Sequence, residues 1–162
     1  MNTERVAVRL GEVRVASGNT VLFAVGLGSC VGIALYDARA RIGGFAHVML
    51  PHPSSARKPT PLGRFASTAI EFLIQEMETA GAARRRLYAR LVGGAAMFEN
   101  LMTDDGPALG ERNVQSARHA LKAAGVPLKG EEVGGNHGRS VHFHVADGRL
   151  LVTSVRHPDV NL

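Results

Sequence analysis

The chain has 162 residues, of which 45% are hydrophobic, and its 19 basic and 14 acidic side chains give a net charge of +5 and a pI near 10.1. This length and composition are typical of a single globular domain, which we expect to span residues 1–162. No apolar run approaches the ~20 residues that cross a bilayer, and one cysteine excludes an internal disulfide and a cysteine-based zinc cage, so we expect a reducing, cytoplasmic setting without membrane insertion.

The first part of the chain is predicted to form short strands that lead into a glycine-rich bend. Alternating apolar residues predict three strands, within residues 6–10, 13–15 and 20–25. Gly26 and Gly28 then let the backbone turn sharply and approach a ligand closely. Cys30, the only cysteine, follows this bend directly.

Two apolar runs, residues 31–37 and 42–50, predict a hairpin that contains His47. A two-residue loop would place Cys30 directly opposite His47, and a four-residue loop would place Cys30 diagonal to it on the same face. A three-residue loop would put the two side chains on opposite faces. Two of the three turns therefore bring a thiol within reach of an imidazole, because opposed Cβ atoms lie about 5 Å apart and diagonal ones roughly 7–8 Å.

A thiol beside an imidazole is a nucleophile with its own base. The imidazole can take the thiol proton, and the imidazolium can later give a proton to departing ammonia. Backbone N–H groups of the bend could receive the developing oxyanion. Against this, a lone cysteine is more often a buried small hydrophobe, so Cys30 and His47 alone leave catalysis and packing both open.

The rest of the chain alternates helices with strands. Helices are predicted over 64–80 and 111–124, because apolar residues recur there at three- and four-residue spacing. Strands are predicted over 87–92, 126–133, 141–145 and 150–155. Segment 51–61, with four prolines, and segment 103–110 are predicted loops. We therefore expect an α/β chain of the α+β type, with predominantly antiparallel sheet layers and two helices packed on one side.

Three glycine pairs lack the spacing of a dinucleotide site and have no Walker lysine. They are Gly43-Gly44, Gly93-Gly94 and Gly134-Gly135. We expect tight turns and close packing, with the second and third pairs crowding near Cys30 and leaving room for a substrate side chain.

Four histidines, His137, His142, His144 and His157, could suggest a metal cluster. No carboxylate or cysteine stands at a recognised ligand spacing to them, so we expect no metal and place them on a solvent-facing strand surface.

Five segments, in the same order along the chain, resemble the CheD family of chemoreceptor glutamine deamidases. They are residues 26–31, 44–51, 93–98, 109–113 and 134–141. The resemblance implies a CheD-like deamidase domain that needs no cofactor and converts glutamines of cytoplasmic chemoreceptor helices to glutamate and ammonia through a thioester. It also implies that Cys30 is the nucleophile and His47 the general base.

The resemblance fails at one position. Members of the family have a threonine six residues before the cysteine as a third, orienting residue, and this chain has Ala24 there. Alanine can neither donate nor accept a hydrogen bond through its side chain. Thr20, Ser29 or a main-chain carbonyl are the alternatives for orienting His47.

The densest basic patch, Arg84-Arg85-Arg86 with Arg90 nearby, is interpreted as a solvated face that helps dock an acidic, Glu/Gln-rich receptor helix. Nucleic acid is not expected, because there is no tryptophan and only Tyr88 lies among these arginines. The resemblance also implies complexes with CheC-type phosphatases, so the alternative function is a regulatory partner with weak or no catalysis.

Overall fold

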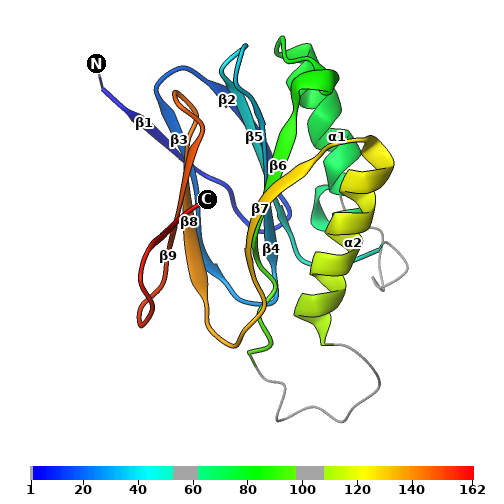
Figure 1. Ribbon diagram of the computed structural model, residues 1–162, viewed down its shortest axis with the longest axis vertical. Helices are drawn as coiled ribbons and strands as arrows, with labels where there is room; N and C mark the ends of the chain where they lie inside the picture. The colour runs from blue at the N-terminus through cyan, green and yellow to red at the C-terminus, as the bar shows by residue number, and fades with distance from the viewer. Residues whose placement is uncertain (1, 53–61, 98–107) are drawn as a thin grey trace.

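The computed structural model describes residues 2–52, 62–97 and 108–162, which form three layers (Figure 1). Helices α1 (Ala66–Thr79) and α2 (Leu109–Ala124) cover one face of a five-stranded sheet, and a second five-stranded sheet packs on its other face. Among the strands of the described residues, β1 with β3 and β6 with β7 are the parallel pairs, and the other strand pairs are antiparallel. The predicted class, α+β with mostly antiparallel sheets and both helices on one side, is confirmed.

The sheet between the helices and the second sheet is here called the central sheet. Its strands, in spatial order, are β2 (Val13–Ser17), β5 (Ile42–Val48), β4 (Val31–Asp37), β6 (Tyr88–Gly93) and β7 (Leu128–Val133). The outer sheet follows the order β1 (Glu4–Ala7), β3 (Thr20–Leu27), β8 (Arg139–His144), β9 (Arg149–Thr153) and β10 (Val160–Asn161). Two short 3₁₀ helices, η2 (Leu62–Arg64) and η3 (Arg84–Arg86), precede α1 and β6.

Strands β4 and β5 are buried along their whole length. Because side chains alternate between faces, Val31, Ile33 and Leu35 pack toward the helices, while Ala34 and Tyr36 pack toward the outer sheet. The central sheet thus contributes to two hydrophobic cores, and any polar group on its inner faces must find a partner or remain unpaired.

The β4–β5 hairpin has the four-residue loop, since Asp37 pairs with Ile42 and residues 38–41 connect them. Gly32 therefore lies opposite His47, and Cys30 lies diagonal to His47 on the same face. A Cβ atom at Gly32 would lie 2.4 Å from the ring of Phe45, so a glycine is required where that ring crosses the strand.

Several element boundaries differ from the predictions. Strand β1 ends at Ala7, and α2 begins at Leu109, so residues 8–10 are wrongly predicted as strand and residues 109 and 110 wrongly as loop. A glycine is required at position 110, although glycine weakens a helix, because a Cβ there would lie within 2.6 Å of the backbone of residues 94 and 95. Most of the two predicted loops, residues 53–61 and 98–107, lies outside the described residues.

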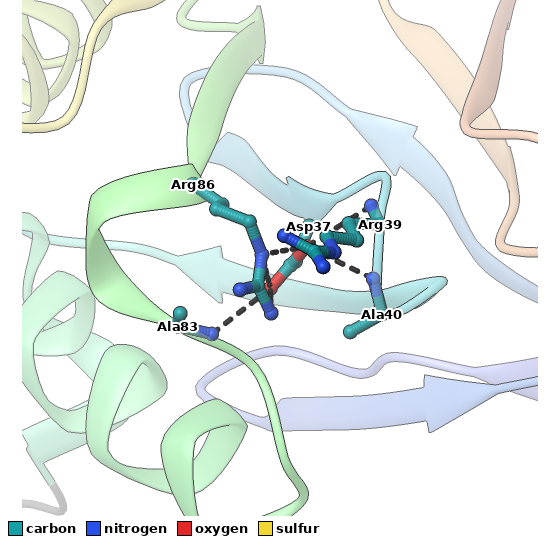
Figure 2. A network of polar contacts seen from close by, with 5 residues as sticks. All are labelled: Asp37, Arg39, Ala40, Ala83 and Arg86. Atoms are coloured by element: carbon teal, nitrogen blue, oxygen red, sulfur yellow. Dashed lines mark hydrogen bonds and ion pairs between the residues drawn. The ribbon is translucent and has the colours of Figure 1, made fainter.

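The far end of β4 is closed by a buried ion pair (Figure 2). Asp37 has no exposed surface, and its carboxylate accepts two hydrogen bonds from Arg86 Nε, at 2.9 and 3.0 Å. The backbone amides of Arg39, Ala40 and Ala83 donate to the same carboxylate at 2.9–3.1 Å. Burial raises the pKa of Asp37, but these hydrogen bonds outweigh burial and hold the pKa far below its usual value.

The predicted solvated arginine face is wrong at Arg90, and two of its other members already pair with carboxylates. Arg86 pairs with Asp37, Arg84 pairs with Glu71, and Arg90 is only 4% exposed between the two sheets. Their partners come from distant parts of the chain, so charge density in the sequence did not show that these cations are already neutralised or enclosed. Of these four arginines, Arg85 alone is exposed and makes no ion pair with another described residue.

Candidate active site

Cys30 lies in a three-residue connection between β3 and β4, residues 28–30, and each carbonyl group of that connection accepts a hydrogen bond. They accept hydrogen bonds from the Ala95 amide to Gly28 (2.8 Å), from Asn113 Nδ2 to Ser29 (2.9 Å) and from the Gly94 amide to Cys30 (2.8 Å). A Cβ at Gly93 would lie 2.3 Å from the Cys30 oxygen, so the approach of β6 requires a glycine, here at φ 110°.

Two amides of this connection, unlike its carbonyls, have no hydrogen-bond partner among the described residues. Across the described part of the chain, the N–H groups of Ser29 and Cys30 donate no hydrogen bond. Successive free amides form the kind of donor site that binds an anion or a developing oxyanion.

His47 is held by the turn of residues 8–12. Its amide donates to the Glu12 carbonyl (3.0 Å), and its own carbonyl accepts from the Gly11 amide (2.8 Å). Its side-chain Nδ1 lies 3.0 Å from the Val8 carbonyl oxygen. Because a carbonyl only accepts, Nδ1 carries the proton and the Nε2 lone pair is free to act as a base.

The group that orients His47 is therefore a main-chain carbonyl, one of the three predicted alternatives. Thr20 is excluded, since its hydroxyl donates to the Ser17 carbonyl at 3.2 Å. Ala24 is 2% exposed in the core between the sheets, and the Val8 amide donates to Phe23 beside it. The carbonyl of Val8 thus stands close to the strand position where the family carries its threonine.

The Nε2 atom of His47 is buried and has no hydrogen-bond partner among the described residues. In particular, no hydrogen bond joins it to the Cys30 thiol, which is half-buried. The diagonal register sets their Cβ atoms roughly 7–8 Å apart, within reach of an imidazole and a rotating thiol. Catalytic hydrogen bonds are often long before substrate binds.

Burial dominates the titration of both groups. It raises the pKa of the Cys30 thiol, and it lowers the pKa of His47 against the opposing effects of the Val8 hydrogen bond and the Glu12 charge. Both groups are therefore neutral near pH 7 in the resting protein. Proton transfer from thiol to imidazole has to accompany nucleophilic attack.

Gly93-Gly94 packs directly on the connection that carries Cys30, as predicted, and Gly134-Gly135 packs on the segment of residues 93–96. The Gly134 amide donates to the Gly93 carbonyl at 3.0 Å, and the Ala96 amide donates to Gly135 at 2.9 Å. Gly94 donates to Cys30 itself. That these loops leave room for a substrate side chain stays a prediction.

The four histidines do not assemble. His137 and His157 stack with ring centroids 3.8 Å apart, whereas His142 and His144 are half-buried on β8, each beside an arginine. No group of three or more His, Cys, Asp or Glu in the described ranges could hold a metal ion. The stacked pair lines an open groove of about 770 Å³ that reaches Gly26 but includes neither Cys30 nor His47.

No helix within the described residues is long and apolar enough to cross a membrane.

Residues 8–12 and Asn113 belong to the site but were not expected there from the sequence. Residues 8–12 act through backbone groups, which leave no pattern in a sequence. Asn113 did leave one signal, a polar residue on the buried stripe of its helix with Gly110, Ala117 and Leu121.

Comparison with known proteins gives a consistent result. The family model described as CheD chemotactic sensory transduction matches residues 49–154. Proteins named "Probable chemoreceptor glutamine deamidase CheD" are 41% identical in Caldanaerobacter subterraneus subsp. tengcongensis (97% of both chains) and 44% identical in Archaeoglobus fulgidus (91% of both). A protein named "Probable chemoreceptor glutamine deamidase CheD 2" in Geobacter metallireducens is 43% identical, over 94% of this chain and 95% of the relative.

A solved structure supports the fold alone. The Neisseria meningitidis protein NMB0706, of the family DUF152, aligns with a TM-score of 0.50 at 14% identity. The alignment covers 83% of this chain and spans 63% of the Neisseria chain.

Proposed function

Since the chain belongs to the CheD family, we propose that it is a chemoreceptor glutamine deamidase in which Cys30 is the nucleophile and His47 the general base. The observation that carries the assignment of residues is the β4–β5 register. Cys30, the only cysteine, directly precedes the hairpin and lies on the same face as the buried His47 Nε2, which has no partner among the described residues. The whole of residues 1–162 is proposed as one deamidase domain, because both cores share the central sheet.

In the first half of the reaction, Nε2 of His47 accepts the Cys30 proton as the sulfur attacks the side-chain carbonyl carbon of a glutamine. We assign the free amides of Ser29 and Cys30 as the donors that receive the resulting oxyanion. The imidazolium then returns its proton to the departing nitrogen, so that the carbon–nitrogen bond breaks and ammonia leaves. A thioester on Cys30 remains.

In the second half, His47 accepts a proton from water as the water oxygen attacks the thioester carbonyl. The carbon–sulfur bond breaks, the sulfur recovers a proton from His47, and glutamate is released. Throughout, the Val8 carbonyl keeps the Nδ1 proton in place and stabilises the imidazolium, which is the task that a third side chain performs in other triads. The alanine at position 24 is therefore compatible with catalysis.

We propose cytoplasmic chemoreceptor helices as the substrate, and a cytoplasmic location follows from that substrate. A CheC-type phosphatase as partner, implied by the resemblance, would make regulation the main role only if Cys30 were dispensable. Replacing Cys30 by alanine separates the two, because a regulatory partner would keep its binding and signalling effects.

The test is mass spectrometry of a purified receptor cytoplasmic fragment after incubation with the wild type or with Cys30→Ala. We expect glutamine-to-glutamate conversion, located by peptide mapping, with the wild type alone. Thr20→Ala is the matched control, since its hydroxyl donates to Ser17 and not to His47, and it should convert the fragment at the wild-type rate. Conversion by Cys30→Ala would overturn the assignment of the nucleophile.

A further inference from the structure

Among the described residues, Asn113 is the one side chain that bonds both to the segment carrying Cys30 and to the segment carrying His47. Its Nδ2 donates to the carbonyl of Ser29 at 2.9 Å and to the carbonyl of Met49 at 3.0 Å. Ser29 directly precedes Cys30, and Met49 comes two residues after His47. Both N–H bonds of the amide group are thereby used.

These two bonds stand where the strand ladder stops. The last pair of the β4–β5 ladder joins Val31 to Val48, so Cys30 and Met49 lie one step beyond backbone pairing. Beyond this pair, the side-chain amide of Asn113 joins the two segments in place of a ladder hydrogen bond. It therefore holds the segments together next to Cys30 and His47.

Burying Asn113 Oδ1 destabilises the fold, so packing alone does not explain an asparagine at this position. Asn113 has no exposed surface and stands on the apolar face of α2, and its Oδ1 is buried without a partner within the described residues. A buried acceptor without a hydrogen bond destabilises the folded state. A leucine would fill such a position without that penalty but would lack both donors.

We propose that Asn113 is a positioning residue, which sets the distance and relative orientation of Cys30 and His47 by holding the carbonyls of Ser29 and Met49 with one amide. This inference rests on the proposed function for its kinetic consequence. Asn113 contacts neither substrate nor the reacting atoms, and it acts through the two segments it joins. Small errors in such geometry cost up to about 100-fold in rate.

Two variants of Asn113 remove its hydrogen-bond donors while nearly preserving its volume. Asn113→Leu and Asn113→Asp keep a similar volume and remove the NH₂ group. We expect both to lower kcat for the receptor fragment by about 10- to 100-fold with KM unchanged, because binding surfaces are untouched. Ser116→Ala is the matched control, since Ser116 is one turn further along α2, is 7% exposed and donates to the Pro51 carbonyl at 2.9 Å. It should lower thermal stability and leave kcat unchanged.

A second readout needs no receptor. The pH profile of Cys30 alkylation by iodoacetamide reports how readily the thiol loses its proton, and Cys30 is the only cysteine. With Asn113 replaced, we expect slower alkylation near neutral pH, because His47 no longer takes the thiol proton as the sulfur attacks the reagent. Ser116→Ala should keep the wild-type profile.

The outcomes are distinct. Wild-type kcat and an unchanged alkylation profile in folded Asn113→Leu or Asn113→Asp would overturn the positioning role. If the wild type converts no receptor glutamine, the proposed function fails, while the alkylation profiles of wild type and variants still decide whether Asn113 couples Cys30 to His47.

Discussion

The two ends of strand β4 differ in whether their buried polar groups have hydrogen-bond partners. At the Asp37 end, each carboxylate oxygen accepts hydrogen bonds, and Arg86 neutralises the charge. At the Cys30 end, His47 Nε2 and Asn113 Oδ1 are buried without partners, and the amides of Ser29 and Cys30 are free within the described part of the chain. One strand thus joins a satisfied site to an unsatisfied one.

The difference separates stability from chemistry. Polar groups with all their hydrogen bonds made stabilise a fold and have nothing left to offer a substrate. Groups left open by a rigid backbone cost stability, but they are free to bind a reacting atom. The comparison predicts that changes at the Cys30 end alter rate more than stability, and that changes at the Asp37 end do the reverse.

The largest effect beyond the loss of Cys30 is expected from His47→Gln. Loss of the general base should lower kcat by about 100- to 10,000-fold. Stability should change little, because the glutamine amide can still donate to the Val8 carbonyl and, like histidine, leaves one buried polar atom without a partner among the described residues. Steady-state deamidation and urea unfolding of the same preparation measure both. Unfolding of His47→Gln at much lower urea than the wild type would show that this end serves stability after all.

Asp37→Asn should give the opposite result. Removing the charge weakens the hydrogen bonds that Arg86 and three backbone amides donate to this buried carboxylate, which should cost about 2 kcal/mol of the free energy of unfolding. The kcat of the folded protein should stay at the wild-type value. Glu71→Gln is the matched control, because it breaks an exposed pair with Arg84 in the same 3₁₀ helix and should cost less than about 1 kcal/mol.

The same carboxylate also fixes a pH dependence with a definite sign. The pKa of Asp37 is lower in the folded protein than in the unfolded chain, so its contribution is fully present above the ordinary pKa and is lost as pH falls through the folded value. Urea unfolding below pH 4 should therefore bring wild type and Asp37→Asn together. A gap that stays constant into that range would contradict the assignment.

The smallest effect should come from Glu12→Gln. The Glu12 charge raises the pKa of His47, so its removal should lower that pKa further and move the acid limb of kcat/KM to lower pH. Glutamine keeps an acceptor for the Arg9 amide, so the turn stays intact. Glu4→Gln, on exposed β1, should leave the pH profile unchanged. A shift to higher pH in Glu12→Gln would reverse the sign and refute the coupling.

Much of the fold could be predicted because the spacing of apolar residues and the positions of glycines are local properties of the sequence. The hairpin pattern limited Cys30 and His47 to three registers, and the apolar stripes gave both helices. The choice among registers depended on the loop of residues 38–41, where several turns fit the sequence equally well.

The rest depends on tertiary partners. Arg86 and Arg90 look like surface cations until distant segments enclose them, and the Val8 carbonyl that orients His47 is a group every residue possesses. Sequence patterns identify side chains that can do chemistry, but not the backbone groups that aim them.

The account stands on Cys30 as the nucleophile at the unsatisfied end of β4, and because Cys30 is the only cysteine, graded alkylation tests it directly. Samples alkylated to different extents by iodoacetamide, with the extent read from intact mass, would be assayed for deamidation of a receptor fragment. We predict that residual activity falls in proportion to the unmodified fraction and reaches zero at complete alkylation. Activity that persists in fully alkylated, folded protein would contradict the account.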